Sequence, residues 1–223
     1  MRNEAKISLP VYKISYAVFF IVILSMVRGV TFSFEIGIAL EAPMAMLAAC
    51  VLADTYTKEI TSKRSEIWRL YPVKKKIYSI YKRIVIQEIF LLSAAVAGYG
   101  LFFLFQNPRR IGMGQNSLEN ETGQFFLYLT AIVVTLGFWG ILSNFLSCLF
   151  RNMWMGIGGC LILWITANSS VGDRYFGAWN LFSYTFRNVE NSGDFSWVCG
   201  KIVCICISMI MMAVLPKMIK KRG

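Results

Sequence analysis

The sequence predicts an all-α membrane protein with six transmembrane helices and cytosolic N- and C-termini. Of its 223 residues, 57% are hydrophobic and 16% are charged, whereas soluble domains are about half apolar and a quarter charged. The apolar residues are gathered in runs close to the about 17–25 residues that cross the hydrocarbon core of a bilayer. We therefore expect residues 1–223 to form a single transmembrane domain in a lipid bilayer.

The apolar runs give the expected helices in chain order. They cover 15–30, 36–53, 84–105, 125–150, 153–168 and 197–215. The first two are joined by a very short connection, which predicts a tight helical hairpin. The fourth is long enough to cross the membrane with a tilt.

The last connection, 171–196, is rich in aromatic residues. Aromatic side chains beside a span usually lie in the membrane interface. A partly re-entrant amphipathic segment in the outer leaflet is the alternative. The sequence leaves both interpretations open.

The distribution of Lys and Arg predicts the orientation. With six spans and a cytosolic N-terminus, the inner segments hold 17 of the 23 cationic residues. Cytosolic loops of membrane proteins carry such an excess. The formal net charge of +11 is explained in this way, because the cations lie between apolar runs, and we expect no nucleic-acid partner.

The composition argues against several kinds of catalysis. The chain has no histidine, which removes Ser-His and Cys-His nucleophiles and imidazole metal sites. The six cysteines have no zinc-site or disulfide spacing. We predict no catalytic, cofactor-binding or metal-binding residue. An intramembrane enzyme with a serine–lysine pair stays an alternative.

The longest hydrophilic inner segment is 54–83. Its apolar residues recur at near-helical spacing on both sides of Pro72, and proline disfavours helix at the residue before it. The pattern predicts a short amphipathic helix, a turn at Tyr71–Pro72 and a second helix leading into the third span. A loop that lies on anionic headgroups, or that is only the positive-inside signal, is the competing interpretation.

This segment resembles the one between the second and third helices of ABC-2 type permeases, the membrane subunits of many ABC exporters. That family often shows a glutamate, an acidic residue seven positions on, and a proline six further, followed by a small aliphatic and a basic residue. The matching residues here are Glu59, Glu66, Pro72, Val73 and Lys75. The similarity extends over the chain in topology, with six spans, cytosolic ends and a large first inner loop.

The resemblance implies a mechanism in which amphipathic coupling and gate helices press on a separate ATP-binding subunit. The coupling residues would be Glu59, Glu66, Ile67, Trp68, Leu70, Pro72 and Lys75. The chain has no G-x-x-x-x-G-K-[ST] loop, so ATP-Mg would be bound by the partner subunit. The resemblance also implies a second permease subunit, identical or related, and export of a peptide or an amphiphilic or antimicrobial compound across a bacterial plasma membrane.

Charged residues inside the expected spans are candidate functional residues, because they are costly in lipid. Arg28 and Glu41 lie at similar depth in the first hairpin and are predicted to form an intramembrane polar pair. A substrate contact by Glu41 is the alternative. Glu88 is expected to reach the inner interface near Lys82 or Arg83. A secondary transporter or small channel that does not use ATP is a further function to weigh.

Overall fold

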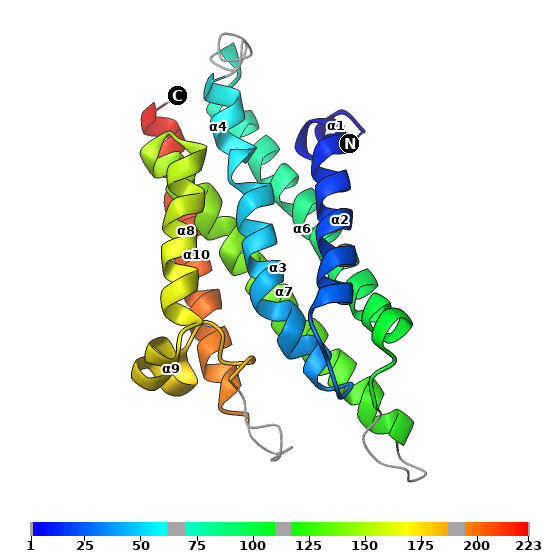
Figure 1. Cartoon of the computed structure of the whole chain (residues 1–223). Coiled ribbons are helices and arrows are strands. Elements are labelled where there is room, and N and C mark those ends of the chain that lie inside the picture. The colour runs from blue at the N-terminus through cyan, green and yellow to red at the C-terminus, as the bar shows by residue number, and fades with distance from the viewer. Residues whose placement is uncertain (1, 62–69, 110–116, 187–194, 223) are drawn as a thin grey trace.

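The computed structural model describes residues 2–61, 70–109, 117–186 and 195–222, and their regular structure is helical (Figure 1). An isolated backbone bridge between Phe32 and Arg109 accompanies the helices. The helices are α1 (Arg2–Ser8), α2 (Val11–Val27), α3 (Glu35–Leu52), α4 (Asp54–Thr61), α6 (Val73–Gln106), α7 (Ser117–Phe150), α8 (Met153–Ala167), α9 (Ser170–Phe176), the 3-10 helix η1 (Gly177–Trp179) and α10 (Trp197–Arg222).

Four helical segments of the described chain are long and apolar enough to cross a membrane. They are Glu35–Glu59, which joins α3 to α4, and Val73–Gln106, Glu121–Phe150 and Trp197–Lys220. The helix α8 and the segment α9–η1 form a fifth candidate, bent by 74°. The helix α2 is apolar but has only 17 residues. The chain is therefore an all-α protein built for a membrane.

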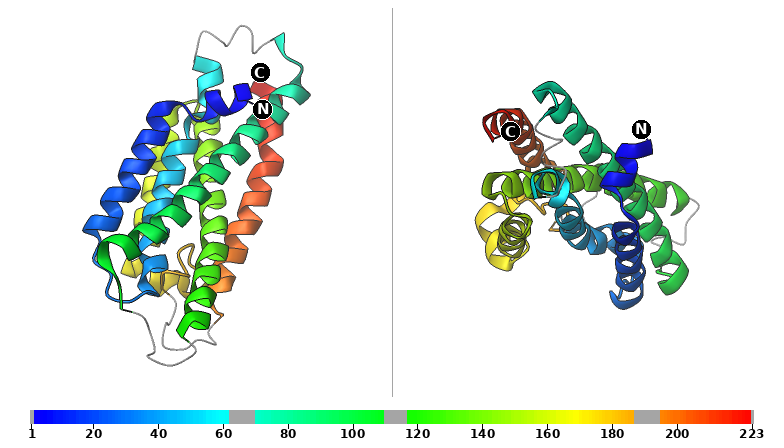
Figure 2. Two further views of the ribbon diagram at one scale, coloured as in Figure 1. Left: turned by 90° about the vertical axis from the view of Figure 1, so that its right-hand side faces the viewer. Right: turned by 90° about the horizontal axis from the view of Figure 1, so that it is seen from above.

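The chain ends lie at the same end of the bundle (Figures 1 and 2). The helix α1, the end of α4, the start of α6 and the end of α10 are gathered there, and we call it the inner end after the predicted orientation. The α2–α3 connection, the end of α6 and α9 lie at the opposite, outer end.

The helix α3 is the centre of the packing. In its most apolar stretch 78% of the residues are buried, against 28% in α6 and in α10. Its buried alanines let the neighbouring helices approach closely, as small residues do in membrane bundles. These alanines are Ala39, Ala42, Ala45, Ala48 and Ala49. The less buried faces of α6 and α10 are left for lipid.

Proline and asparagine residues set several helix boundaries. Pro10 separates α1 from α2, and Pro72 is the N-cap of α6, where its missing N–H costs no hydrogen bond. Asn152 caps α8 by accepting a 2.9 Å hydrogen bond from the backbone N–H of Trp154. Asn107 ends α6 with a left-handed backbone (φ 43°), a conformation that asparagine tolerates.

Two segments of the structure add to what the sequence predicts. The helix α3 continues across Ala53 into α4, the short helix expected at the start of the inner segment, and Asp54, Thr55 and Glu59 of this helix are buried in the bundle. The aromatic segment divides: Tyr175 and Trp179 are exposed, while Phe182 is buried and stacks on Trp139 at 5.3 Å between ring centroids. This segment thus has both an interfacial part and a part packed into the bundle.

Candidate functional site

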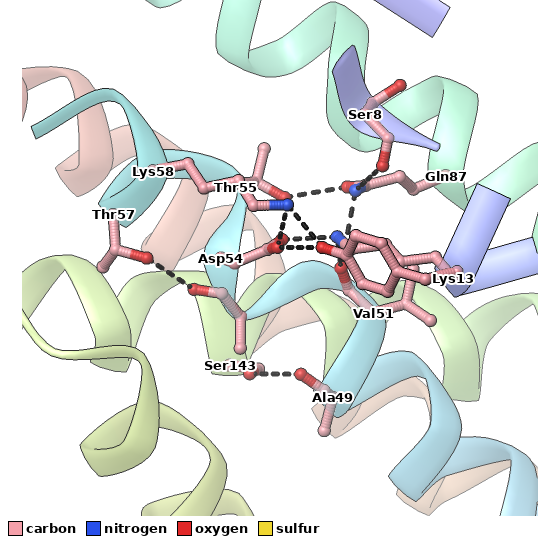
Figure 3. Close-up of polar contacts among 12 residues, drawn as sticks. Ser8, Lys13, Ala49, Val51, Asp54, Thr55, Thr57, Lys58, Gln87 and Ser143 are labelled. Atoms are coloured by element: carbon pink, nitrogen blue, oxygen red, sulfur yellow. Dashed lines mark hydrogen bonds and ion pairs between the residues drawn. The ribbon is translucent and has the colours of Figure 1, made fainter. Parts of the chain in front are cut away.

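A group of buried charges lies at the inner end, where α4 meets α2 and α6 (Figure 3). Asp54, the first residue of α4, forms ion pairs with Lys13 of α2 and with Lys58, the latter at 2.6 Å. The Lys13 ammonium also donates a 2.5 Å hydrogen bond to the backbone oxygen of Val51. Asp54 and Lys13 are 5% and 3% exposed, so α2 is bound to the α3–α4 junction by a buried pair.

Uncharged side chains continue this contact to α6 and α1. The Thr55 hydroxyl donates a 2.8 Å hydrogen bond to the side-chain oxygen of Gln87 in α6. The Gln87 amide donates at 2.9 Å to the backbone oxygen of Ser8, the last residue of α1. Because Thr55 and Gln87 are buried, these bonds form away from competing water.

A second set of ion pairs lies one turn further along α4. Arg83 of α6 forms ion pairs with Glu59 of α4 and with Glu4 of α1, the latter at 2.5 Å. The Ser79 hydroxyl donates a 3.0 Å hydrogen bond to the second oxygen of Glu4. Burial opposes ionisation of Glu4, but the bonds and charge of Arg83 and the Ser79 bond outweigh it and lower the Glu4 pKa. We call the whole group the inner network: Glu4, Ser8, Lys13, Asp54, Thr55, Lys58, Glu59, Arg83 and Gln87.

The predicted coupling residues lie in different surroundings in the structure. Glu59 is 4% exposed and belongs to the inner network. Pro72 is the N-cap of α6, while Leu70 is 85% exposed and Lys75 is exposed. The remaining predicted residues, Glu66, Ile67 and Trp68, lie outside the described residues.

Glu41 forms an ion pair, but its partner is Lys201 of α10 and not Arg28. The Glu41 carboxylate also accepts hydrogen bonds from Thr135 of α7 at 2.9 Å and from Thr185 at 2.5 Å. The prediction of an Arg28–Glu41 pair was wrong because Glu41 points into the bundle, where it is 0% exposed, whereas Arg28 follows the last residue of α2. We call Glu41 and Lys201 the outer pair.

The sequence analysis did not select Lys201 as a site residue, although the sequence carries a signal for it. It lies inside the apolar run 197–215, and a cation inside such a run is costly unless it is paired. Besides Glu41, its ammonium donates to the hydroxyl of Thr135 at 2.8 Å and to the backbone oxygen of Leu181 at 3.1 Å. Lys13, Asp54 and Arg83 lie at span ends, where charges are ordinary and carry no such signal.

No family model, no curated protein and no solved structure matches the chain. Its function must therefore be inferred from its own residues.

Proposed function

We propose that the chain is the membrane subunit of a transporter of the ABC-2 permease type, worked by a separate ATP-binding subunit. Six spans result if α2 and the bent α8–α9 pair each cross the membrane once, together with the four long helical segments. An even number of spans leaves both ends of the chain on one side of the membrane, together with the connection between α4 and α6, and the distribution of Lys and Arg predicts that this side is the cytosol. ATP-Mg would be bound only by the partner subunit.

The observation that carries this proposal is the inner network. Buried ion pairs and hydrogen bonds join α4 to α2 and to α6, and join α6 in turn to α1. The continuous segment Glu35–Glu59 extends this connection into α3. A displacement of the segment between α4 and α6 would therefore move three membrane helices together. A loop that only marked the cytosolic side would have no need of buried connections to its neighbours.

The surface near Pro72 suits a protein partner. Leu70, Tyr71 and Tyr78 are 85%, 50% and 68% exposed, and Lys74 and Lys75 beside them are exposed. Apolar anchors surrounded by cations bind well to a groove with an acidic rim, because the apolar side chains supply affinity and the charges supply steering and register. We infer that the ATP-binding subunit presents such a groove.

The outer end suits an amphiphilic substrate. A groove of about 710 Å³ between α8, α9 and α10 is lined mainly by apolar side chains, including Tyr175, Phe176 and Trp179. Apolar cavities of this size accommodate an acyl chain or a few apolar side chains. This supports export of an amphiphile or an apolar peptide, released toward the outer leaflet.

Co-purification tests the proposal. The tagged full chain, extracted from its native membrane in a mild detergent, is expected to bring with it a separate polypeptide that carries a G-x-x-x-x-G-K-[ST] loop and hydrolyses ATP. Leu70→Ser should weaken this association. Tyr175→Ser is the matched control, because Tyr175 is 81% exposed at the outer end and should leave it unchanged. Recovery of the chain without any ATP-binding polypeptide would contradict the proposal.

The outer pair favours a second candidate, a secondary transporter driven by an ion gradient. Ionisable groups inside a membrane bundle often belong to ion pathways, and Glu41 and Lys201 are 0% and 4% exposed. Transport into vesicles separates the two candidates. The first requires ATP and the partner subunit, whereas the second proceeds in vesicles of the purified chain when only an ion gradient is imposed.

A further inference from the structure

Asn144 of α7 is a buried polar residue without a hydrogen-bond partner in the part of the chain that the structure describes. Its side chain is 0% exposed, and neither its amide nitrogen nor its carbonyl oxygen has a partner among the described residues. Buried polar groups are nearly always paired, because an unpaired one loses its bonds to water without replacement. Lipid cannot supply the missing bonds. Asn144 is therefore unfavourable for packing alone.

Glu88 of α6 lies beside the same part of α7. A Cβ atom placed on Gly140 would be 2.5 Å from the carboxyl oxygen Oε1 of Glu88, so Gly140 makes room for this carboxyl. Oε1 of Glu88 is also buried, and no described residue forms a hydrogen bond with it. Gly140 and Asn144 are four residues apart and lie on one face of α7, about 6 Å apart along the axis. Asn144 therefore lies one helical turn along α7 from the glycine that makes room for Glu88, and the two side chains form no hydrogen bond with each other.

The expectation that Glu88 reaches Lys82 or Arg83 was wrong. Arg83 is engaged by Glu4 and Glu59, and the Lys82 ammonium lies 5.9 Å from the ring centre of Tyr78. Among the described ion pairs, none includes Glu88.

The elements around the α6–α7 contact offer Glu88 no counter-ion. The helix α7 has no charged residue from Gln124 to its end at Phe150. The other charged residues on the packed helices belong to the inner network or the outer pair, or lie toward the helix ends: Glu35 of α3, Lys74, Lys75, Lys76 and Lys82 of α6, Glu119 and Glu121 of α7, and Lys217, Lys220, Lys221 and Arg222 of α10.

Glu88 is partly exposed as a residue, but its Oε1 is buried, and a carboxyl with an oxygen buried in an apolar bundle and no counter-ion is more stable in its neutral form. We propose that Glu88 and Asn144 form a proton-binding site inside the membrane. Glu88 carries the proton, and the Asn144 amide supplies a donor and an acceptor to the water that hydrates the carboxylate when the proton leaves. A metal ion is not the ligand, because Ca²⁺ and Mg²⁺ take six or more oxygens and the described residues contain no group of three or more metal-ligating His, Cys, Asp or Glu.

This site goes beyond the proposed function and does not depend on it. Glu88 is five residues from Arg83 on the same helix, so gain or loss of the proton would act on the helix that the inner network holds. The site would give the chain a proton-dependent step whether an ATP-binding subunit or a gradient supplies the energy.

Reaction with dicyclohexylcarbodiimide tests the site, because this apolar reagent adds to protonated carboxyls in apolar surroundings. The carboxyl proton moves to a carbodiimide nitrogen, the carboxyl oxygen bonds to the central carbon, and no group leaves. In the full chain reconstituted in vesicles, mass spectrometry is expected to find the adduct on Glu88. Labelling should fall about ten-fold per pH unit above its midpoint. Glu35, also partly exposed, accepts backbone hydrogen bonds from Thr31 and Phe32, and it should stay unlabelled.

Asn144→Leu tests the second member of the site. Leucine has a similar shape and needs no partner, so the variant should fold at least as well as the parent chain. Loss of the amide should raise the pH midpoint of Glu88 labelling, because the carboxylate loses hydration. The proposal is overturned if Glu88 is not labelled, if a water-soluble carbodiimide labels it as strongly, or if Asn144→Leu leaves the midpoint unchanged.

Discussion

The inner network and the outer pair both place charges inside a membrane bundle, but they differ in their access to water. In the outer pair, the side chains of Glu41 and Lys201 are 1% and 4% exposed. In the inner network, the side chains of Lys58 and Glu4 are 40% and 28% exposed, although those of Lys13, Glu59 and Arg83 are at most 6% exposed. The inner charges thus border water, and the outer charges do not.

This difference indicates which end of the bundle can rearrange. Ions that border water can exchange a protein partner for water at small cost, whereas separating a fully buried pair leaves each charge unpaired. The outer pair also fixes α3, α7 and α10 to the residues around Leu181 and Thr185. We therefore expect movement to begin at the inner end, where the ATP-binding subunit is proposed to dock, with the outer pair as a fixed point.

The largest effect is expected from Lys201→Met. It leaves the Glu41 carboxylate buried without its cation, which costs about 3–5 kcal/mol of stability. The variant should be strongly depleted from the membrane and should unfold in detergent at a much lower temperature. Glu41→Gln combined with Lys201→Met should recover most of the loss.

Lys217→Met is the matched control for this test, because Lys217 is exposed on the same helix and its loss should have little effect. Equal stability of Lys201→Met and Lys217→Met would show that the outer pair does not hold the bundle together.

A smaller effect is expected from Glu59→Gln in the inner network. Arg83 keeps Glu4 as a second partner, so the loss should be close to that of one charged hydrogen bond, about 1.5–3 kcal/mol. Thermal unfolding in detergent measures it. Glu4→Gln should cost less than Glu59→Gln, since Glu4 is partly exposed and its interaction is screened by water. The reverse order would contradict the description of the network.

The smallest expected effect is the contribution of Glu4 to the pH dependence of stability. Its pKa is lowered from the ordinary value of 4.5, so its contribution to stability is complete above that value and is lost as the pH falls through the lower, folded-state pKa. The unfolding temperature of the parent chain should therefore decline with acidification more steeply than that of Glu4→Gln. Identical pH profiles would show that the Glu4–Arg83 pair adds no stability.

The sequence predicted the helices well because each long apolar run satisfies its backbone within a helix. The ranges 84–105 and 125–150 lie inside α6 and α7, and 153–168 ends one residue beyond α8. The sequence did not predict that Asp54 and Glu59 of α4 are buried. The local pattern of polar and apolar residues does not reveal that these two carboxylates have partners in α2 and α6. Long-range pairs such as Glu41 with Lys201, 160 residues apart, depend on how the helices pack.

Photo-cross-linking in native membranes tests the central claim, that the cytosolic segment between α4 and α6 docks an ATP-binding subunit. A photoreactive residue replaces Leu70 at the inner end or, as a control, Tyr175 at the outer end. The account predicts that position 70 captures a polypeptide with a nucleotide-binding loop, in a yield that changes when ATP is added, and that position 175 does not. Cross-links from position 70 to lipid alone would contradict it.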